Sequence, residues 1–186
     1  MAILVPFDRF KDEAALVGKM LTGYAVLEID LMDCVDAVRH EEGVVLKAMF
    51  RVRGEKRRID VAADLGRERF DRLGLSDDFG LAIAAVHHCR EIRNQYAHCV
   101  WWDDNTPQLA FRAVEVIAEQ EDTVSLADLV PTHVTGPFLQ GQLDYFEYAD
   151  DLLLWLIREG LRLQRLPFHP AIQRPAALAQ PGLSLP

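Results

Sequence analysis

The chain has 186 residues, of which 50% are hydrophobic, and it carries a formal net charge of −9 at pH 7. That length suffices for one domain with a buried core, and so high a hydrophobic content excludes a disordered chain. The acidic balance argues against a general nucleic-acid coat protein, and no apolar run approaches the roughly 20 residues that a membrane-spanning helix needs.

The start of the chain lacks the features of a secretory signal. An apolar patch lies within the first ten residues, but no basic region precedes it and no small-residue cleavage site follows it. The cysteines are odd in number, and all fall in helical patterns: Cys34, Cys89 and Cys99. This usage is typical of buried thiols in a cytoplasmic protein and not of a disulfide framework, and we expect that localisation.

The first part of the chain is predicted to be helical after an extended lead-in over Met1–Phe7. Apolar side chains then recur every three or four positions, which predicts a helix over Asp8–His40. Its expected buried face consists of Leu16, Met20, Tyr24, Leu27, Leu31, Cys34 and Val38. Gly43 should interrupt the helical structure before a shorter helix over Val44–Arg51.

Two further helices are predicted before the pattern changes. A turn at Arg53-Gly54 should lead into a helix over Glu55–Leu73. Gly74 follows in the position where a left-handed glycine commonly ends a helix. The next helix is predicted from Asp77 to about Cys99.

Beyond that helix the spacing of apolar residues becomes alternating. Strand-like segments on both sides of a cluster of turn formers predict a β-hairpin over about residues 100–114. Residues Val116–Thr132 are predicted to form either a short helix or a turn with a loop. A long last helix is predicted over Gly136–Gln164, with Thr135 as its cap. Its buried stripe consists of Leu139, Leu143, Phe146, Ala149, Leu153 and Leu156.

These elements predict a mostly α fold. We expect a helical bundle of about four to five helices with a small β-hairpin insertion and an irregular Pro-rich C-terminal tail. Residues 1–166 should form a single domain, and residues 167–186 a mobile or extended tail in which closely spaced prolines prevent helices and strands.

The helix over Asp77–Cys99 carries the candidate site. One stripe of it is apolar or neutral: Leu81, Ala85, Cys89, Ile92, Tyr96 and Cys99. At about 100° per residue, a polar arc lies opposite that stripe, formed by His87, Glu91, Asn94 and His98. Arg90 and Arg93 flank the arc. These groups should face solvent, a ligand or a second copy of the chain. Capping of the helix, pairing with Glu91 or a hydrogen bond to a neighbouring loop would also account for them.

The string Arg93-Asn94-x-x-Ala97-His98 resembles the Arg-polar-x-x-x-His signature of the HEPN superfamily (higher eukaryotes and prokaryotes nucleotide-binding). Members of that family are helical bundles, and many are metal-independent RNA endonucleases. The resemblance covers the signature and the helical frame around it, not the hairpin or the tail. It implies a homodimer in which the two motif copies form one cleft across a two-fold axis.

The resemblance also implies roles for the residues of the signature. His98 would act as general base or acid on the ribose 2′-hydroxyl, Arg93 would neutralise charge on the scissile phosphate, and Asn94 would orient one of them. The products would be a 2′,3′-cyclic phosphate and a 5′-hydroxyl, and no metal or other cofactor would be needed. The predicted binding residues around this site are Arg90, Glu91, His87, Tyr96, Arg57 and Arg58.

A locally basic segment runs from Lys47 to Arg72, with nine basic residues against five acidic ones. Ion pairs one helical turn apart on a solvated face would explain it. A local phosphate-binding surface, including Arg57 and Arg58, is the alternative explanation.

Two classes of function therefore stay open. The first is a metal-independent RNA endonuclease, which in prokaryotic family members often belongs to a toxin–antitoxin or phage-defence system beside a nucleotidyltransferase antitoxin. The second is a non-catalytic dimeric helical module that binds a protein partner or a nucleotide. A metal site at His87, Glu91 and His98 is disfavoured because one helix offers too few ligands.

Overall fold

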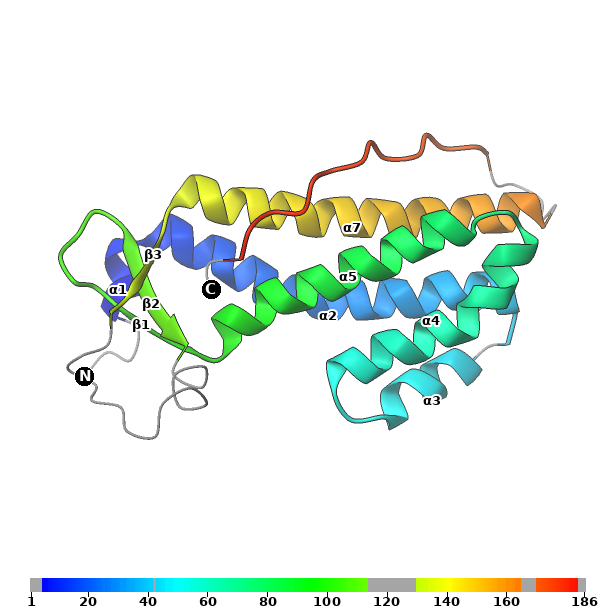
Figure 1. Ribbon diagram of the computed structural model, residues 1–186, viewed down its shortest axis with the longest axis horizontal. Helices are drawn as coiled ribbons and strands as arrows, with labels where there is room; N and C mark the ends of the chain where they lie inside the picture. The colour runs from blue at the N-terminus through cyan, green and yellow to red at the C-terminus, as the bar shows by residue number, and fades with distance from the viewer. Residues whose placement is uncertain (1–4, 42, 114–129, 165–169, 184–186) are drawn as a thin grey trace. The chain divides into compact units, whose positions relative to one another are not determined.

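Figure 1 shows a computed structural model of the chain, which describes residues 5–41, 43–113, 130–164 and 170–183. Most of it is helical: α1 (Val5–Arg9), α2 (Lys11–Arg39), α3 (Val44–Arg51), α4 (Glu55–Arg72), α5 (Ser76–Ala97) and α7 (Gly136–Leu163). The strands are β1 (Cys99–Trp102), β2 (Leu109–Ala113) and β3 (Thr132–Val134). The predicted mostly α fold with a small β insertion is confirmed.

The chain divides into two compact units. The sheet unit comprises Met1–Thr22, Glu91–Asp144 and Pro181–Pro186, and the bundle unit comprises Gly23–Arg90 and Tyr145–Gln180. The three longest helices, α2, α5 and α7, each contribute residues to both units. A single domain over residues 1–166 stays a prediction.

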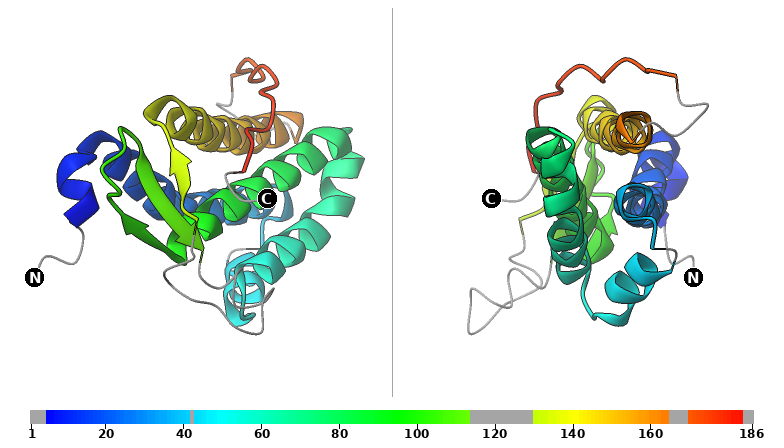
Figure 2. Two further views of the ribbon diagram at one scale, coloured as in Figure 1. Left: turned by 60° about the vertical axis from the view of Figure 1, so that its left-hand side comes forward. Right: turned by 90° about the vertical axis from the view of Figure 1, so that its right-hand side faces the viewer.

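The sheet unit holds three antiparallel strands in the order β1-β2-β3, seen side by side in Figure 2. Trp101 lies opposite Phe111 in the β1–β2 pairing, and their rings are 5.1 Å apart. Leu109, Ala110 and Phe111 are fully buried, so β2 is the central strand in packing as well as in order. The predicted hairpin is confirmed. The third strand was not predicted, and most of the segment Val116–Thr132 lies outside the described residues.

The expectation of an extended lead-in is wrong for the described residues Val5–Phe7, which belong to α1. The backbone N–H of Phe10 donates to the carbonyl of Pro6 at 3.1 Å, so a full helical turn forms before α2 begins. Proline fits here because the N–H groups of a first helical turn have no partner within the helix. The ring of Phe7 packs on Trp101 at 5.4 Å, which supplies tertiary support that sequence spacing does not reveal.

In the bundle unit, glycines lie at helix boundaries as predicted. Gly74 has a φ of 72°, and its N–H donates to the carbonyl of Asp71 at 3.0 Å. The N–H of Leu75 reaches back to the carbonyl of Phe70 at 2.9 Å, which completes a Schellman cap. Gly43, with a φ of 74°, separates α2 from α3. The positive φ explains glycine at both positions, since a Cβ would be strained there.

The predicted last helix is confirmed over α7. The hydroxyl of Thr135 accepts a hydrogen bond from the N–H of Phe138 at 3.3 Å, as expected of an N-cap residue. Every residue of the predicted stripe is buried: Leu139, Leu143, Phe146, Ala149, Leu153 and Leu156. Of the predicted face of α2, Leu16 is only half-buried and the remaining six residues are buried.

Residues 170–183 of the predicted tail have neither helix nor strand. This part of the tail nevertheless contacts helices. Within the bundle unit, the Nε of Arg174 donates to Asp78 at 2.7 Å, and its guanidinium lies 5.9 Å from the centre of the Trp155 ring. Among the helices described, none is at once long enough and apolar enough to cross a membrane.

Candidate functional site

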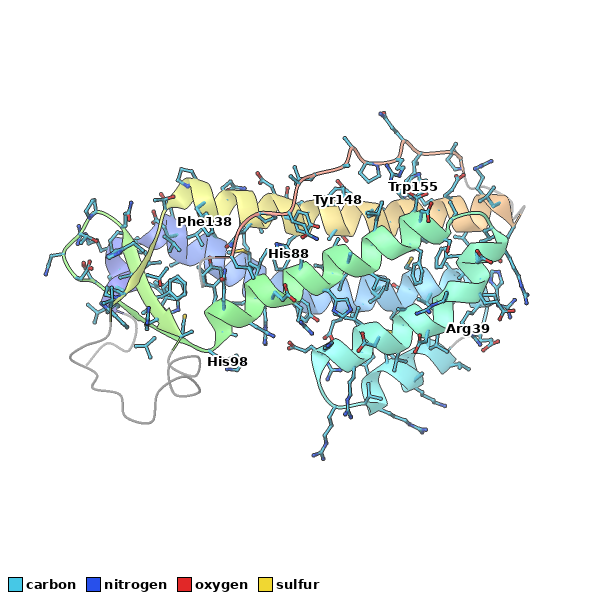
Figure 3. All side chains as sticks on the ribbon, in the orientation of Figure 1. Arg39, His88, His98, Phe138, Tyr148 and Trp155 are labelled. Carbon is cyan, nitrogen blue, oxygen red and sulfur yellow. The ribbon has the colours of Figure 1, made fainter. Side chains whose placement is uncertain are left out.

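The candidate motif lies at the C-terminal end of α5. The helix ends at Ala97, and His98 occupies the turn before β1 begins at Cys99 (Figure 3). Arg93, Asn94 and His98 all belong to the sheet unit. The reason the helix stops here is that the following residues, rich in β-branched and aromatic side chains, pair with β2.

The buried side of this helix end is anchored by Tyr96. Its hydroxyl donates to Oε1 of Gln142 at 2.6 Å, and both side chains are buried. Its ring lies 5.6 Å from Trp101 and 5.4 Å from Phe111. With 2% of its surface exposed, Tyr96 fixes the last turn of α5 on the sheet. Its predicted role in binding stays a prediction.

The polar side carries the three residues of the signature. Nη1 of Arg93 donates to Oδ1 of Asn94 at 3.0 Å, and both side chains are half-buried. His98 is exposed. Because Asn94 and His98 are four residues apart, they fall on the same side of the helix and the turn that continues it. The arrangement offers an oriented guanidinium and an imidazole open to solvent.

Cys99, next to the motif, does not provide a nucleophile. Its thiol donates to the carbonyl of Tyr96 at 3.2 Å, and burial raises the pKa of the thiol to about 12. It therefore stays protonated at neutral pH, when thiolate is the reactive form. Unlike Cys34 and Cys89, which are buried as predicted, Cys99 is only half-buried.

The other predicted binding residues are distributed over both units. Glu91 is exposed in the sheet unit, whereas Arg90 and His87 are half-buried in the bundle unit. Nε2 of His87 lies 3.4 Å from a carboxylate oxygen of Asp60 on α4. His87 is thus part of a contact between α5 and α4.

Two of the predicted binding residues are arginines of α4. Arg57 is exposed, whereas Arg58 is half-buried. Nη1 of Arg58 lies 3.0 Å from a carboxylate oxygen of Glu28, a residue with 6% exposure, and its guanidinium covers the ring of Phe50 at 5.2 Å. Arg58 therefore joins α4 to α2 and α3, which is a packing role.

The expected apolar stripe of α5 is shifted at its start. Leu81 is 48% exposed, and Ala82 and Val86 are buried instead. Ala85, Cys89, Ile92 and Tyr96 are buried as predicted. The buried face is wider than one stripe because neighbouring positions such as 85 and 86 both pack inward, which a single line of residues at helical spacing does not represent.

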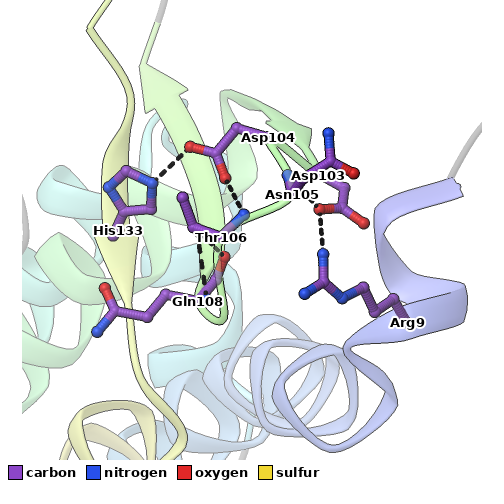
Figure 4. A network of polar contacts seen from close by, with 7 residues as sticks. All are labelled: Arg9, Asp103, Asp104, Asn105, Thr106, Gln108 and His133. Atoms are coloured by element: carbon purple, nitrogen blue, oxygen red, sulfur yellow. Dashed lines mark hydrogen bonds and ion pairs between the residues drawn. The ribbon is translucent and has the colours of Figure 1, made fainter.

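One polar network was not predicted (Figure 4). In the sheet unit, Nε2 of His133 lies 2.7 Å from Oδ2 of Asp104, whose other oxygen accepts the N–H of Thr106 at 3.1 Å. Asp103 accepts bonds from Arg9 at 2.6 Å and from the N–H of Asn105 at 2.8 Å. The bonds from Thr106 and His133 lower the pKa of Asp104 to about 2.

The hydrogen bonds of this network stabilise the turn between β1 and β2 and connect it to β3. Asp103, Asp104 and Thr106 are residue types that bond nearby backbone groups in turns, so that part was visible in the sequence. His133 lies 29 residues from Asp104 and gave no local signal. The Thr106 hydroxyl is engaged with the carbonyl of Gln108 at 3.2 Å, so the Asp104–His133 pair does not activate it as a nucleophile.

A second unpredicted feature is a pair of carboxyl groups in the bundle unit. Asp30 on α2 and Asp150 on α7 share a hydrogen bond. Burial, the bond to Asp150 and the charges of Asp150 and Asp33 raise the pKa of Asp30 to about 6. Within the described residues, no cluster of three or more His, Cys, Asp or Glu side chains is arranged to hold a metal ion.

Comparison with known proteins gave no match to a family model, to a curated protein or to a solved structure.

Proposed function

We propose that this chain is a HEPN-like, metal-independent RNA endonuclease that acts as a homodimer. The observation that carries the proposal is the contact of Arg93 Nη1 with Asn94 Oδ1 at 3.0 Å, one helical turn before the exposed imidazole of His98. Transfer of RNA phosphoryl groups to the 2′-oxygen needs a proton acceptor and a fixed cation, and these residues supply both.

In the proposed reaction, His98 accepts the proton of the ribose 2′-hydroxyl while that oxygen attacks the adjacent phosphorus. The bond from phosphorus to the 5′-oxygen of the next nucleotide breaks, and that oxygen takes up a proton from His98 of the second copy, which starts the reaction as the protonated imidazolium. The products are a 2′,3′-cyclic phosphate and a 5′-hydroxyl. Arg93 neutralises the phosphate charge with a planar donor fork, which Asn94 holds in one orientation.

The test is cleavage of mixed RNAs in EDTA. Replacing His98 with alanine should lower the rate on the order of 10²–10⁴-fold, the usual contribution of a positioned acid–base group. Arg93→Lys should also be severely impaired, because an ammonium cannot reproduce a two-point phosphate contact. RNA methylated at the 2′-oxygen of the cut site should resist cleavage.

His40→Ala serves as the matched control, because His40 is an exposed histidine of the bundle unit that contacts Gln164 and does not belong to the signature. It should cleave at the normal rate. Full cleavage by a well-folded His98→Ala protein would remove His98 from the mechanism. The same outcome for Arg93→Lys would remove the phosphate-binding role of Arg93.

A second candidate is a non-catalytic dimeric helical module that binds a protein partner or a nucleotide. The formal charge of −9 favours it, since an acidic chain repels RNA. It is distinguished by the same experiment, because such a module has no cleavage activity and His98→Ala would change only stability or partner binding. A cytoplasmic toxin–antitoxin or phage-defence setting, with a nucleotidyltransferase antitoxin, is proposed on the resemblance alone.

A further inference from the structure

The hairpin formed by α3 and the start of α4 concentrates positive charge in this acidic chain. Five basic side chains are exposed there: Lys47, Arg51, Arg53, Lys56 and Arg57. Within the part of the chain that the structure describes, none of these five takes part in an ion pair, whereas Arg58 on the same hairpin pairs with Glu28. We call these five residues, together with Phe50, the basic hairpin.

The same hairpin also exposes apolar side chains. Phe50 is 37% exposed although the guanidinium of Arg58 lies over its ring at 5.2 Å, and Leu46, one helical turn earlier on α3, is 46% exposed. Each of these apolar residues is followed in the sequence by a basic one, Lys47 after Leu46 and Arg51 after Phe50. A partner for this surface must therefore offer regularly placed negative charge together with an apolar or aromatic face.

We infer that the basic hairpin binds single-stranded RNA, with its cations on the phosphates and Phe50 stacked on a base. Three of the five cations are arginines, whose planar forks match phosphate oxygens. An exposed aromatic ring between cations is typical of proteins that hold single strands, because an unpaired base has a free π-face. A duplex keeps its bases stacked on one another, so Phe50 selects unpaired strands.

An anionic membrane surface fits the hairpin less well. The helix α3 has eight residues, and Val45 and Met49 on its apolar side are fully buried in the protein. A helix that lies in a membrane interface needs that side free for the lipid. The choice of RNA rests on the proposed ribonuclease function, and it assigns to that function a single-stranded substrate held outside the motif.

Binding is measured by fluorescence anisotropy with a labelled 12-nucleotide single-stranded RNA in EDTA, using the His98→Ala protein so that the strand stays intact. The affinity is determined over a series of salt concentrations. Each phosphate contact to a single strand contributes about −0.7 to the slope of log K against log salt. The variant Lys56→Gln/Arg57→Gln should therefore flatten the slope by about 1.4.

Phe50→Ala tests the stacking contribution separately. It should weaken binding of the single strand by roughly tenfold and leave the salt slope unchanged, because it removes no charge. It should leave binding of a 12-base-pair duplex RNA unaltered. Thermal melting of each variant confirms that the fold is intact.

Arg67→Gln/Arg72→Gln is the matched control. It removes the same charge from the same helix, but from residues that are paired with Asp64 and Glu68. Its salt slope should equal that of the parent protein. Equal effects of both double variants, or no effect of either, would overturn the inference. Binding to phosphatidylserine vesicles that depends on the basic hairpin, without binding of RNA, would overturn it in favour of a membrane surface.

Failure of this inference is distinguishable from failure of the proposed function. If the unmodified protein does not cleave RNA in EDTA but binds it through the basic hairpin, the ribonuclease proposal fails and this inference stands. If it cleaves RNA and the hairpin variants bind normally, the inference fails and the ribonuclease proposal stands.

Discussion

Asp30 shows how one half-buried carboxyl group makes the stability of a protein depend on pH. Burial and the bond to Asp150 raise the pKa of Asp30 from its usual value of 3.8 to about 6. Since the folded pKa lies above the unfolded one, the favourable contribution is fully present below pH ~4 and is lost as pH rises through ~6. Asp33 on α2 adds a further negative charge.

Asp30→Asn is therefore expected to raise the free energy of unfolding at pH 7.5 by on the order of 1 kcal/mol, after allowance for partial exposure to solvent. At pH 3.5 it should have little effect. Urea unfolding at the two pH values measures this. The control Asp151→Asn removes the same charge from an exposed neighbour on α7, and an equal gain from it would refute a specific role for Asp30.

At Gly66, the stability of the fold depends on the space around the residue and not on charge. A Cβ at Gly66 would lie 2.5 Å from a ring carbon of Phe79, whose ring stacks on Phe70 with centres 4.3 Å apart. Gly66→Ala should therefore lower the free energy of unfolding by about 1–3 kcal/mol, the usual cost of overpacking. Gly80 is also helical but has no atom within 4 Å of its added Cβ, so Gly80→Ala should stabilise by about 0.5–1 kcal/mol. Thermal or urea unfolding measures the free energy of unfolding of both variants. If both substitutions changed it in the same direction, the packing argument would be contradicted.

Whether the role of a candidate-site residue could be predicted depends on how far away in the sequence its contact partner lies. The polar side of α5 followed from helical period alone, so the placement of Asn94 and His98 was predictable. The packing roles of Tyr96 and Arg58 were not. Their partners, Gln142 and Glu28, lie 46 and 30 residues away, and no local pattern indicates such contacts.

At the scale of elements, the sequence specifies helix ends best where a residue has a local physical reason to be there. Gly74 and Thr135 end and begin helices through backbone conformation and capping, and both bounds were predicted to within one residue. α1 and β3 have five and three residues, too few to give a periodic signal. Both depend on contacts with β1 or β2 that only the folded chain supplies.

β3 offers a direct test of that dependence. Asp104, its pKa lowered to about 2, accepts a bond from His133 on β3. Because the folded pKa lies below the usual 3.8, the stabilising contribution of Asp104 is present above pH ~4 and is lost as pH falls through ~2. His133→Ala should raise the pKa of Asp104 toward 3.8.

The measurement is NMR titration of the Asp104 carboxyl carbon, with amide exchange followed at β3. Exchange of the backbone N–H groups in the β2–β3 pairing should become faster in His133→Ala, because an anchor of the short strand is lost. An unchanged titration midpoint and unchanged exchange would show that the bond to His133 does not hold β3.

For the whole molecule, the proposed homodimer makes a prediction about concentration. If the two motif copies form one cleft, a single chain holds half a site, and only the dimer cleaves RNA. Mass action then requires the activity per chain to fall on dilution. Once monomers dominate, each tenfold dilution should lower the activity per chain about tenfold. Cleavage assays across a dilution series, with sedimentation at the same concentrations, measure this.

Two copies joined in tandem by a flexible Gly/Ser linker provide the control. The linker fixes the effective concentration of the second copy on the order of millimolar, so dilution should no longer lower the activity. Introducing His98→Ala into both copies should abolish that activity. Constant activity per unlinked chain at concentrations where sedimentation finds only monomer would mean that one copy of Arg93, Asn94 and His98 is a complete site, and the two-fold cleft would have to be abandoned.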